Sequence, residues 1–305
     1  MLPLRLSVIS VCLAVVNVLS LRPCWNQSPT IVEVNGVYHV FASTAKEAGY
    51  CAAPQVFYFE PHKLWYLVYQ NGNAAYSTNS DISNPAGWSA PKNFFDSMRS
   101  FIWENIGNGN WVDMWTICDS SDCYLFTSDD NGHLYRSQTS LGNFPNGMGN
   151  TVIALQNTNT YALFGASNVY STGDGEYLLL VEAIGSDGAR YFRSWIFTSL
   201  SGTWTSLADT EANPFARANN VKFSAEAWTK SISHGEIVRT NVDQTMTITP
   251  CNLRYLYQGV DPNGSGDYNA MPELGCGYPK QVKTSAQHQH TIYPDSTFCR
   301  SPGTR

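Results

Sequence analysis

A unit of strand, tight turn and strand recurs along this chain at nearly even spacing. Each apolar, strand-like segment is followed by an Asn-Gly or Asp-Gly turn, a second strand-like segment and a loop that ends in an aromatic residue. The three first segments cover residues 64–69, 123–126 and 177–181. Asn-Gly and Asp-Gly permit the positive φ angles of a type I′ turn, so they mark tight hairpins. The turn glycines Gly72, Gly132 and Gly188 lie 60 and 56 residues apart.

A repeat of this length with several strands per unit indicates an all-β, five-bladed β-propeller. Five blades need about 280 residues, which fits a chain of 305 residues that loses an N-terminal signal. The alternative is a β-sandwich whose hairpins look alike by chance. The aromatic residue that ends each loop favours the propeller.

Two regions break the repeat. A first blade begins at Val37, after the Asn35-Gly36 turn, yet the second blade opens near Gln55 with almost nothing between them. The first blade is therefore truncated, by roughly 30 residues if the blades are equal. After Ala270 the strand alternation stops. We expect a propeller domain over residues 21–272 and an irregular C-terminal tail over residues 273–305.

Residues 1–20 resemble a secretory signal peptide. Arg5 supplies the positive charge, and small residues lie near the expected cleavage site. The apolar run is about 14 residues, shorter than the ~20 that span a bilayer. The sequence thus predicts an extracellular, secreted protein and no membrane partner. Cys118 and Cys123 flank a short turn and could form a local disulfide, while removal of Cys12 leaves an odd number of cysteines.

Composition narrows the function. Charged residues make up 14% of the chain and aromatic residues 13%, and the net charge is −6. A nucleic-acid partner is not expected, because such proteins need a basic face. The 43% hydrophobic content is enough for a core, which argues against disorder. Fingerprints of serine hydrolases, kinases and dehydrogenases are absent from the sequence.

Acidic residues next to aromatic ones are the first candidates for chemistry. Asp113 lies between Trp111 and Trp115, and strand alternation places all three on one face. A carboxylate held against aromatic rings suits sugar binding, and burial can tune its pKa. The alternative is a solvated aspartate at the end of a strand.

Two further groups of polar residues have both structural and functional interpretations. Glu182 follows an apolar strand and needs a partner if buried, for which Arg190 or Arg193 is available. His234 and Glu236 flank a glycine and could bind a ligand or simply pair within the core. Structural pairing is at least as well supported for both groups.

Long runs of this sequence resemble glycoside hydrolase family 62 over about residues 28–272. The runs that carry the resemblance are 37–46, 53–58, 63–77, 111–115, 166–170, 182–188, 233–236 and 255–259. The resemblance implies an α-L-arabinofuranosidase that releases arabinose side chains from arabinoxylan. The resemblance implies a five-bladed propeller, an inverting mechanism and a calcium ion near the central channel.

An inverting hydrolase needs two carboxyl groups, one as acid and one as base. The resemblance implies that Asp113 is a third acid, which orients the general acid and raises its pKa. The family's base position aligns with Ser28 and its acid position with Gly165, and neither residue can replace a carboxylate in proton transfer. The first alignment is anchored by Pro29 and the second by the run that starts at Ala166.

Other site residues come from the resemblance alone. It implies that Gln55, Trp115, Arg193 and Tyr268 contact arabinose and that His234 belongs to the calcium site. The expected partner is arabinoxylan or another arabinose-substituted polysaccharide, and we expect a monomer.

Three readings of the function remain open. The chain is a secreted α-L-arabinofuranosidase by descent with doubtful turnover, or a catalytically inactive arabinoxylan-binding propeller. In the third, the sequence is an imperfect gene translation of an active enzyme, because the short first blade, the junction at Cys51 and the tail all fit missed exons or a shifted frame. Gly165 does not follow from such an error, since its neighbours are intact.

Overall fold

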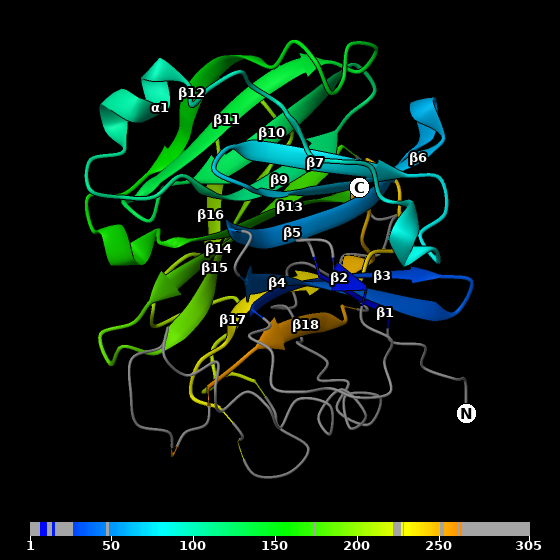
Figure 1. Ribbon diagram of the computed structural model, residues 1–305. Helices are drawn as coiled ribbons and strands as arrows, with labels where there is room; N and C mark the ends of the chain where they lie inside the picture. Colours follow the sequence, from blue (N-terminus) through cyan, green and yellow to red (C-terminus); the bar gives the residue numbers. More distant parts are fainter. Residues whose placement is uncertain are drawn as a thin grey trace, which may run out of the picture.

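Antiparallel strands form nearly all of the regular structure (Figure 1). This computed structural model describes residues 7–10, 14–15, 27–46, 49–173, 175–221, 227, 229–250, 253–260 and 263. Within these residues there is one short α-helix, α1 (Ser100–Asn105), and three single-turn 3₁₀ helices, η1 (Glu60–His62), η2 (Pro85–Gly87) and η3 (Thr160–Ala162). The all-β prediction is therefore confirmed.

The strands fall into four hydrogen-bonded sheets. The first sheet has the order β2-β1-β4-β5-β6-β7-β8, with β3 paired to β4. Its strands are β1 (Ser7–Ser10), β2 (Ala14–Val15), β3 (Gln27–Val34), β4 (Val37–Lys46), β5 (Gly49–Phe59), β6 (Leu64–Gln70), β7 (Ala74–Asn79) and β8 (Lys92–Asn93). Only the β1–β4 pair is parallel in this sheet.

The other three sheets are antiparallel. The second has the order β12-β11-β10-β9, built from β9 (Val112–Cys118), β10 (Asp122–Ser128), β11 (His133–Ser140) and β12 (Gly149–Gln156). The third has the order β13-β14-β15-β16, built from β13 (Gly165–Gly173), β14 (Glu176–Ile184), β15 (Arg190–Phe197) and β16 (Thr205–Ala208). The fourth pairs β17 (Ser233–Ile237) with β18 (Tyr255–Gln258).

The three predicted hairpins are present at the predicted turns. They join β6 to β7, β10 to β11 and β14 to β15. Gly72, Gly132 and Gly188 have φ angles of 68°, 90° and 77°. These angles lie in the region that glycine adopts without steric cost, which explains why the repeat places glycine there.

Five strands, β3, β5, β9, β13 and β17, lie side by side and are called the inner strands. Contacts run from β3 to β5, from β5 to β9, from β9 to β13, from β13 to β17 and from β17 back to β3. This arrangement is of the propeller type (Figure 1). No sheet closes on itself among the described residues, and the first and last sheets lack the regular four strands. The count of five blades therefore stays a prediction.

The junction between the first and second units has a direct structural consequence. Thr44 pairs with Cys51 and Lys46 with Gly49, so β4 and β5 form one continuous hairpin. The β3–β4 pair is thereby joined to the strands of the following unit in a single sheet. The truncation of the first blade at the Cys51 junction stays a prediction.

A strap of residues 242–246 crosses the C-terminal ends of three inner strands. The Tyr58 N–H donates to the Val242 carbonyl at 2.8 Å, and the Cys118 N–H donates to the Gln244 carbonyl at 2.8 Å. The Ser171 N–H donates to the Met246 carbonyl at 3.1 Å. The strap covers this end of β5, β9 and β13, which leaves the N-terminal ends of these strands for a site.

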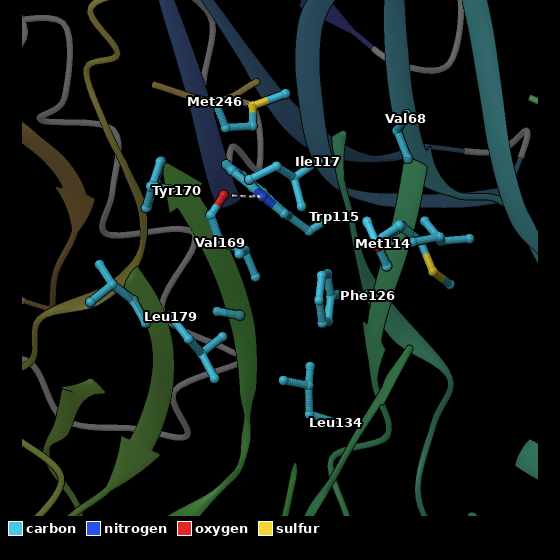
Figure 2. Packing of buried hydrophobic residues seen from close by; sticks show 14 of the residues in the cluster. Val68, Met114, Trp115, Ile117, Phe126, Leu134, Val169, Tyr170, Leu179 and Met246 are labelled. Atoms are coloured by element: carbon cyan, nitrogen blue, oxygen red, sulfur yellow. Dashed lines mark hydrogen bonds between the residues drawn. The ribbon is translucent and has the colours of Figure 1, made fainter. Parts of the chain in front are cut away.

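The main core lies between the sheets that contain β9 and β13. Figure 2 shows Trp115 of β9 beside Val169 and Tyr170 of β13, with Met246 of the strap next to them. The Trp115 indole N–H donates to the Val169 carbonyl at 2.9 Å. The ring of Trp115 meets that of Tyr170 edge to face at 5.4 Å. A second core, around Phe41, Trp65 and Tyr69, belongs to the first sheet.

The structure describes only part of the residues that the predictions on the chain ends and cysteines concern. The tail over residues 273–305 lies outside them, and the predicted signal peptide includes the short strands β1 and β2. The sulfurs of Cys118 and Cys123 are 2.04 Å apart, which is disulfide distance. None of the helices in the described part of the chain has the length and apolarity to cross a bilayer.

A buried glutamine links two of the inner strands, and its loss tests the packing. The Gln55 amide donates to the Thr116 carbonyl and accepts from the Thr116 N–H, both at 2.7 Å. Gln55→Leu leaves both backbone groups buried without a partner, so we expect a loss of about 2–4 kcal/mol in the free energy of unfolding.

Urea unfolding of the purified protein measures this loss. Gln70→Leu is the matched control, because the Gln70 side-chain oxygen has no hydrogen-bond partner. An equal stability of both variants would contradict the structural role of Gln55.

Candidate functional site

A polar pocket lies where the inner strands begin. It is lined by residues from the N-terminal ends of β3, β5, β9, β13 and β17. Ser28, Asp113, Trp115 and His234 line it together, although they are far apart in the sequence. The structure thus brings four of the predicted site residues to one place.

The same backbone irregularity repeats around this pocket. In β3, β5, β9, β13 and β17 the register with the neighbouring strand shifts near the pocket, and each inner strand carries one extra residue. Four non-glycine residues at these shifts have left-handed backbones: Ser28 (φ 55°), Ala53 (φ 49°), Asp113 (φ 56°) and Ala166 (φ 46°). Bulges of this kind re-aim side chains, and such strained residues gather at functional sites. The backbone therefore marks this pocket as a site.

Asp113 is the carboxylate at the centre of the pocket wall. Its Oδ2 accepts from the Ala166 N–H at 2.6 Å and from the Ser128 hydroxyl at 3.0 Å. Its Oδ1 lies 3.1 Å from His234 Nε2. Burial raises the pKa of Asp113, but the His234 charge and these hydrogen bonds outweigh it and hold the pKa below its usual value. Asp113 is therefore ionised near neutral pH.

His234 connects Asp113 to a second buried ion pair. Its Nδ1 lies 3.5 Å from Glu182 Oε2, and its backbone N–H donates to the same oxygen at 2.7 Å. Burial lowers the pKa of His234, but Asp113 and Glu182 outweigh it and raise the pKa above its usual value. Arg190, not Arg193, pairs with Glu182. Burial raises the pKa of Glu182, yet Arg190 and His234 hold it below the ordinary value.

Glu236 belongs to the pocket wall but is held by structural partners. It accepts from the Thr30 hydroxyl and, at 2.9 Å, from the Ile31 N–H. Its Oε1 is 2.8 Å from Arg239 Nε. Burial raises the pKa of Glu236 despite these partners. These contacts favour the structural interpretation of this residue.

Ser28 stands at the pocket with a polar but uncharged side chain. Its backbone N–H donates to Gln258 Oε1 at 2.7 Å, which fixes the start of β3 against β18. The carboxylates that line the pocket are those of Asp113 and Glu236, and Glu236 is held by Thr30 and Ile31. A serine hydroxyl at the predicted base position cannot accept a proton from water as a carboxylate does.

Gly165 lies directly beside two aspartates. A Cβ at this glycine would be 2.7 Å from Asp113 Oδ2 and 3.2 Å from Asp130 Oδ1. Asp113 thus occupies the space where a side chain at residue 165 would begin. The carboxylate end of Asp113 would have to shift before any larger residue could be accommodated.

Asp130, two residues before the turn glycine Gly132, is a further site candidate. It lies between β10 and β11 with a φ of 54°. Burial and the nearby Asp113 charge raise its pKa to about 7. A carboxyl group with a raised pKa next to one with a lowered pKa is typical of acid–base sites. The doubled Asp129-Asp130 before Asn131 is the sequence signal that could have drawn attention to it.

The predicted arabinose contacts are distributed unevenly. Trp115 lines the pocket, whereas Gln55 is fully buried with its amide held by Thr116. The Arg193 guanidinium donates to the Ala162 and Asp209 carbonyls and lies 4.8 Å from the centre of the Trp195 ring. Tyr268 lies outside the described residues. The roles of these four residues in substrate binding stay predictions.

The surroundings of His234 do not form a calcium cage of side chains. Calcium takes six to eight oxygen ligands, whereas both ring nitrogens of His234 face carboxylates. In the described part of the chain, no group of three or more His, Cys, Asp or Glu side chains could hold a metal ion. Calcium therefore stays a prediction from the resemblance.

A groove lies beside the pocket on the same end of the inner strands. Its lining includes Gln70, Trp103, Asn110 and Trp111. Trp103 projects from α1 with 72% of its surface exposed, although large aromatic side chains are usually mostly buried. A tryptophan face next to amide side chains suits the apolar faces and hydroxyl edges of sugar rings.

The comparisons with known proteins point to one family. The model described as glycosyl hydrolase family 62 matches residues 33–276. The α-L-arabinofuranosidase C of Cellvibrio japonicus is 44% identical over 277 residues, which covers 81% of this chain and 42% of that protein. The chain therefore spans about two fifths of the length of this relative.

Solved structures of similar chains share the fold. The catalytic domain of a family 62 α-L-arabinofuranosidase from Coprinopsis cinerea is 59% identical, with a TM-score of 0.79 over 81% of this chain and 88% of that one. A family 62 hydrolase in complex with xylotriose is 53% identical, with a TM-score of 0.77 over the same shares of 81% and 88%.

Removal of the imidazole tests the charged contacts around Asp113. His234→Gln leaves Asp113 without its opposite charge, so we expect a loss of about 3–5 kcal/mol in the free energy of unfolding. The pKa of His234 is raised in the folded protein, so this stabilisation is full below about pH 6.5 and is lost as the pH rises through the folded pKa.

Urea unfolding at pH 6 and at pH 9 measures both effects. The exposed His62 provides the matched control, His62→Gln. A difference between wild type and His234→Gln that is as large at pH 9 as at pH 6 would contradict the ionic role.

Proposed function

We propose that this chain, which belongs to glycosyl hydrolase family 62, binds arabinofuranosyl side chains of arabinoxylan and releases little or no arabinose from them. The single observation that carries the proposal is the pocket lined by both Asp113 and Ser28, with Gly165 directly next to Asp113. The family's other members named above are α-L-arabinofuranosidases. The proposal includes secretion directed by residues 1–20 and action as a monomer outside the cell.

The chemistry of an inverting glycosidase defines what the pocket lacks. One carboxylic acid gives a proton to the leaving oxygen, and one carboxylate takes a proton from the attacking water on the opposite face of the sugar. Asp113 is ionised and engaged by three hydrogen-bond or ionic partners, so it suits the positioning of an acid rather than proton donation. Residues 28 and 165, where the family resemblance implies base and acid, carry a hydroxyl and a hydrogen atom.

Binding does not depend on those two groups. The groove at Trp103 is available for sugar rings, because this side chain is 72% exposed, whereas Trp111 and Trp115 are buried in the core. One family member is described in complex with xylotriose. The groove beside the pocket supports a xylan main chain as the polymer that this chain binds.

An imperfect gene translation remains the alternative origin of the missing parts. The continuous β4–β5 hairpin lies where the first blade loses its outer strands. A transcript read across Tyr50 and Ala52 tests this origin, because a retained intervening segment would restore the full first blade. An imperfect gene translation leaves Gly165 unexplained, since the residues on both sides match the family pattern.

Restoring the two carboxyl groups tests the proposed cause of the missing turnover. We expect purified wild-type protein to release little or no arabinose from wheat arabinoxylan. The double variant Ser28→Asp/Gly165→Glu should release at least about 10²-fold more, because each group contributes roughly 10²–10⁴-fold. Arabinose is measured by chromatography, and Asp122→Asn in the double variant serves as a surface control. Robust release by wild type would contradict the proposal.

The groove residue Trp103 tests polymer binding separately from turnover. Trp103→Ala should weaken binding to arabinoxylan by roughly 5–30-fold, the effect of losing one aromatic anchor of about 1–2 kcal/mol. Affinity electrophoresis in gels that contain the polysaccharide measures the change. Phe101→Ala is the matched control, because Phe101 lies on the same helix, is 38% exposed and does not line the groove. Equal effects of both substitutions would argue against the groove.

A further inference from the structure

We propose that Asp130 is the proton donor to the leaving sugar oxygen, in place of the side chain that Gly165 lacks. This inference rests on the proposed function and changes one part of it. The chain then lacks a working base but keeps a working acid.

The position of the Asp130 carboxyl supports this role. Asp130 Oδ1 lies 3.2 Å from the point that a Cβ at residue 165 would occupy, and Asp113 Oδ2 lies 2.7 Å from it. A longer acidic side chain at residue 165 would extend through this same region. The carboxyl groups of Asp130 and Asp113 therefore both border the position where a side chain at residue 165 would begin.

The charges around the Asp130 carboxyl also support this role. Asp113 on β9 faces it with negative charge, while His234 on β17 and Arg190 on β15 act on it with positive charge. Asn110, which lines the groove, forms a side-chain hydrogen bond with it. Burial and Asp113 outweigh the cations and raise the pKa of Asp130 to about 7. The group therefore carries a proton in the pH range where a general acid is most effective.

The two aspartates divide the roles. Asp113 accepts hydrogen bonds from the Ala166 N–H and the Ser128 hydroxyl, and its charge raises the pKa of Asp130. Two neighbouring carboxyl groups whose pKa values move apart in this way are typical of acid–base assignments. Asp113 thus acts on Asp130 as the resemblance implies that it acts on the family's acid.

The turn that carries Asp130 is held rigidly. Asp130 has a left-handed backbone, which aspartate adopts more readily than most residues. The preceding Asp129 is fixed by the Tyr135 hydroxyl at 2.8 Å and by His133 Nδ1 at 2.7 Å. Gly132 packs so closely that a Cβ there would lie 2.3 Å from the Asn157 carbonyl. The turn is thereby pinned on both sides of Asp130.

The proposed step balances as follows. The Asp130 proton passes to the glycosidic oxygen as the bond from that oxygen to the anomeric carbon breaks, and the electron pair of the bond stays with the oxygen. Water forms the new bond to the anomeric carbon from the opposite face and loses its proton to a base. That base is solvent in this chain and an introduced carboxylate in a Ser28→Asp variant. Asp130 then takes a proton from solvent.

A gain of function at residue 28 tests the acid directly. If Asp130 is a working acid, Ser28→Asp alone should raise arabinose release from arabinoxylan by at least about 10²-fold over wild type. Ser28→Asp/Asp130→Asn should lose that gain. Ser28→Asp/Asp122→Asn is the matched control and should keep it, because Asp122 lies at the far end of β10.

The leaving group separates an acid from a structural residue. An aryl arabinofuranoside with a nitrophenol leaving group needs little protonation, so Asp130→Asn in the Ser28→Asp background should reduce its hydrolysis less than about 10-fold while arabinoxylan hydrolysis falls by roughly 10²-fold. Equal losses on both substrates would overturn the proposal. If Asp130→Asn does not fold, the pH profile of Ser28→Asp replaces it. Activity must fall as the pH rises through the pKa of Asp130, and a profile that stays flat above neutral pH overturns the proposal.

The failure of this inference differs from the failure of the proposed function. An inactive Ser28→Asp variant overturns the inference. If Ser28→Asp/Gly165→Glu is active in the same assay, the proposed function stands without it. If that double variant is also inactive, both are wrong. Thermal unfolding of each variant ensures that activities of folded proteins are compared.

Discussion

A buried chain of four charges, Asp113–His234–Glu182–Arg190, connects three of the sheets around the pocket. Its members come from β9, β17, β14 and β15, and successive groups carry opposite charge. Taking each charge out of water is expensive, and the attraction of its neighbours compensates only when every partner is in place. The chain therefore makes the sheets dependent on one another, and it fixes Asp113 at the pocket at the same time.

The pocket itself is made by a backbone device that repeats with the strands. Each inner strand carries an extra residue where it reaches the pocket, and Ser28, Ala53 and Ala166 adopt left-handed backbones there. No local preference of serine or alanine favours this conformation. Tertiary packing imposes it, which is why a reading of turn residues and alternation misses the bulges. The hairpins, in contrast, follow from Asn-Gly and Asp-Gly alone, and all three are found where the sequence predicts them.

The same distinction explains which site residues could be predicted. Asp113 is predictable because Trp111 and Trp115 flank it in the sequence, although the bulge in β9 breaks the alternation that predicts all three on one face. Glu182 is predictable because an apolar strand must pair its carboxylate. Asp130 depends on Asp113 and on Gly165, which approach it only in the folded chain. Gln55 shows the reverse case, because its amide is held by the Thr116 backbone, a partner that the sequence does not indicate.

The absence of a side chain at residue 165 also avoids repulsion between like charges next to the pocket. A carboxylate there would approach the ionised Asp113 in surroundings of low dielectric constant, where like charges repel strongly. With glycine, Asp113 Oδ2 instead accepts the Ala166 N–H at 2.6 Å. Catalytic groups commonly reduce the stability of the fold that holds them, and their loss raises it. The charge chain and the bulged strands can therefore persist without a carboxylate at this position.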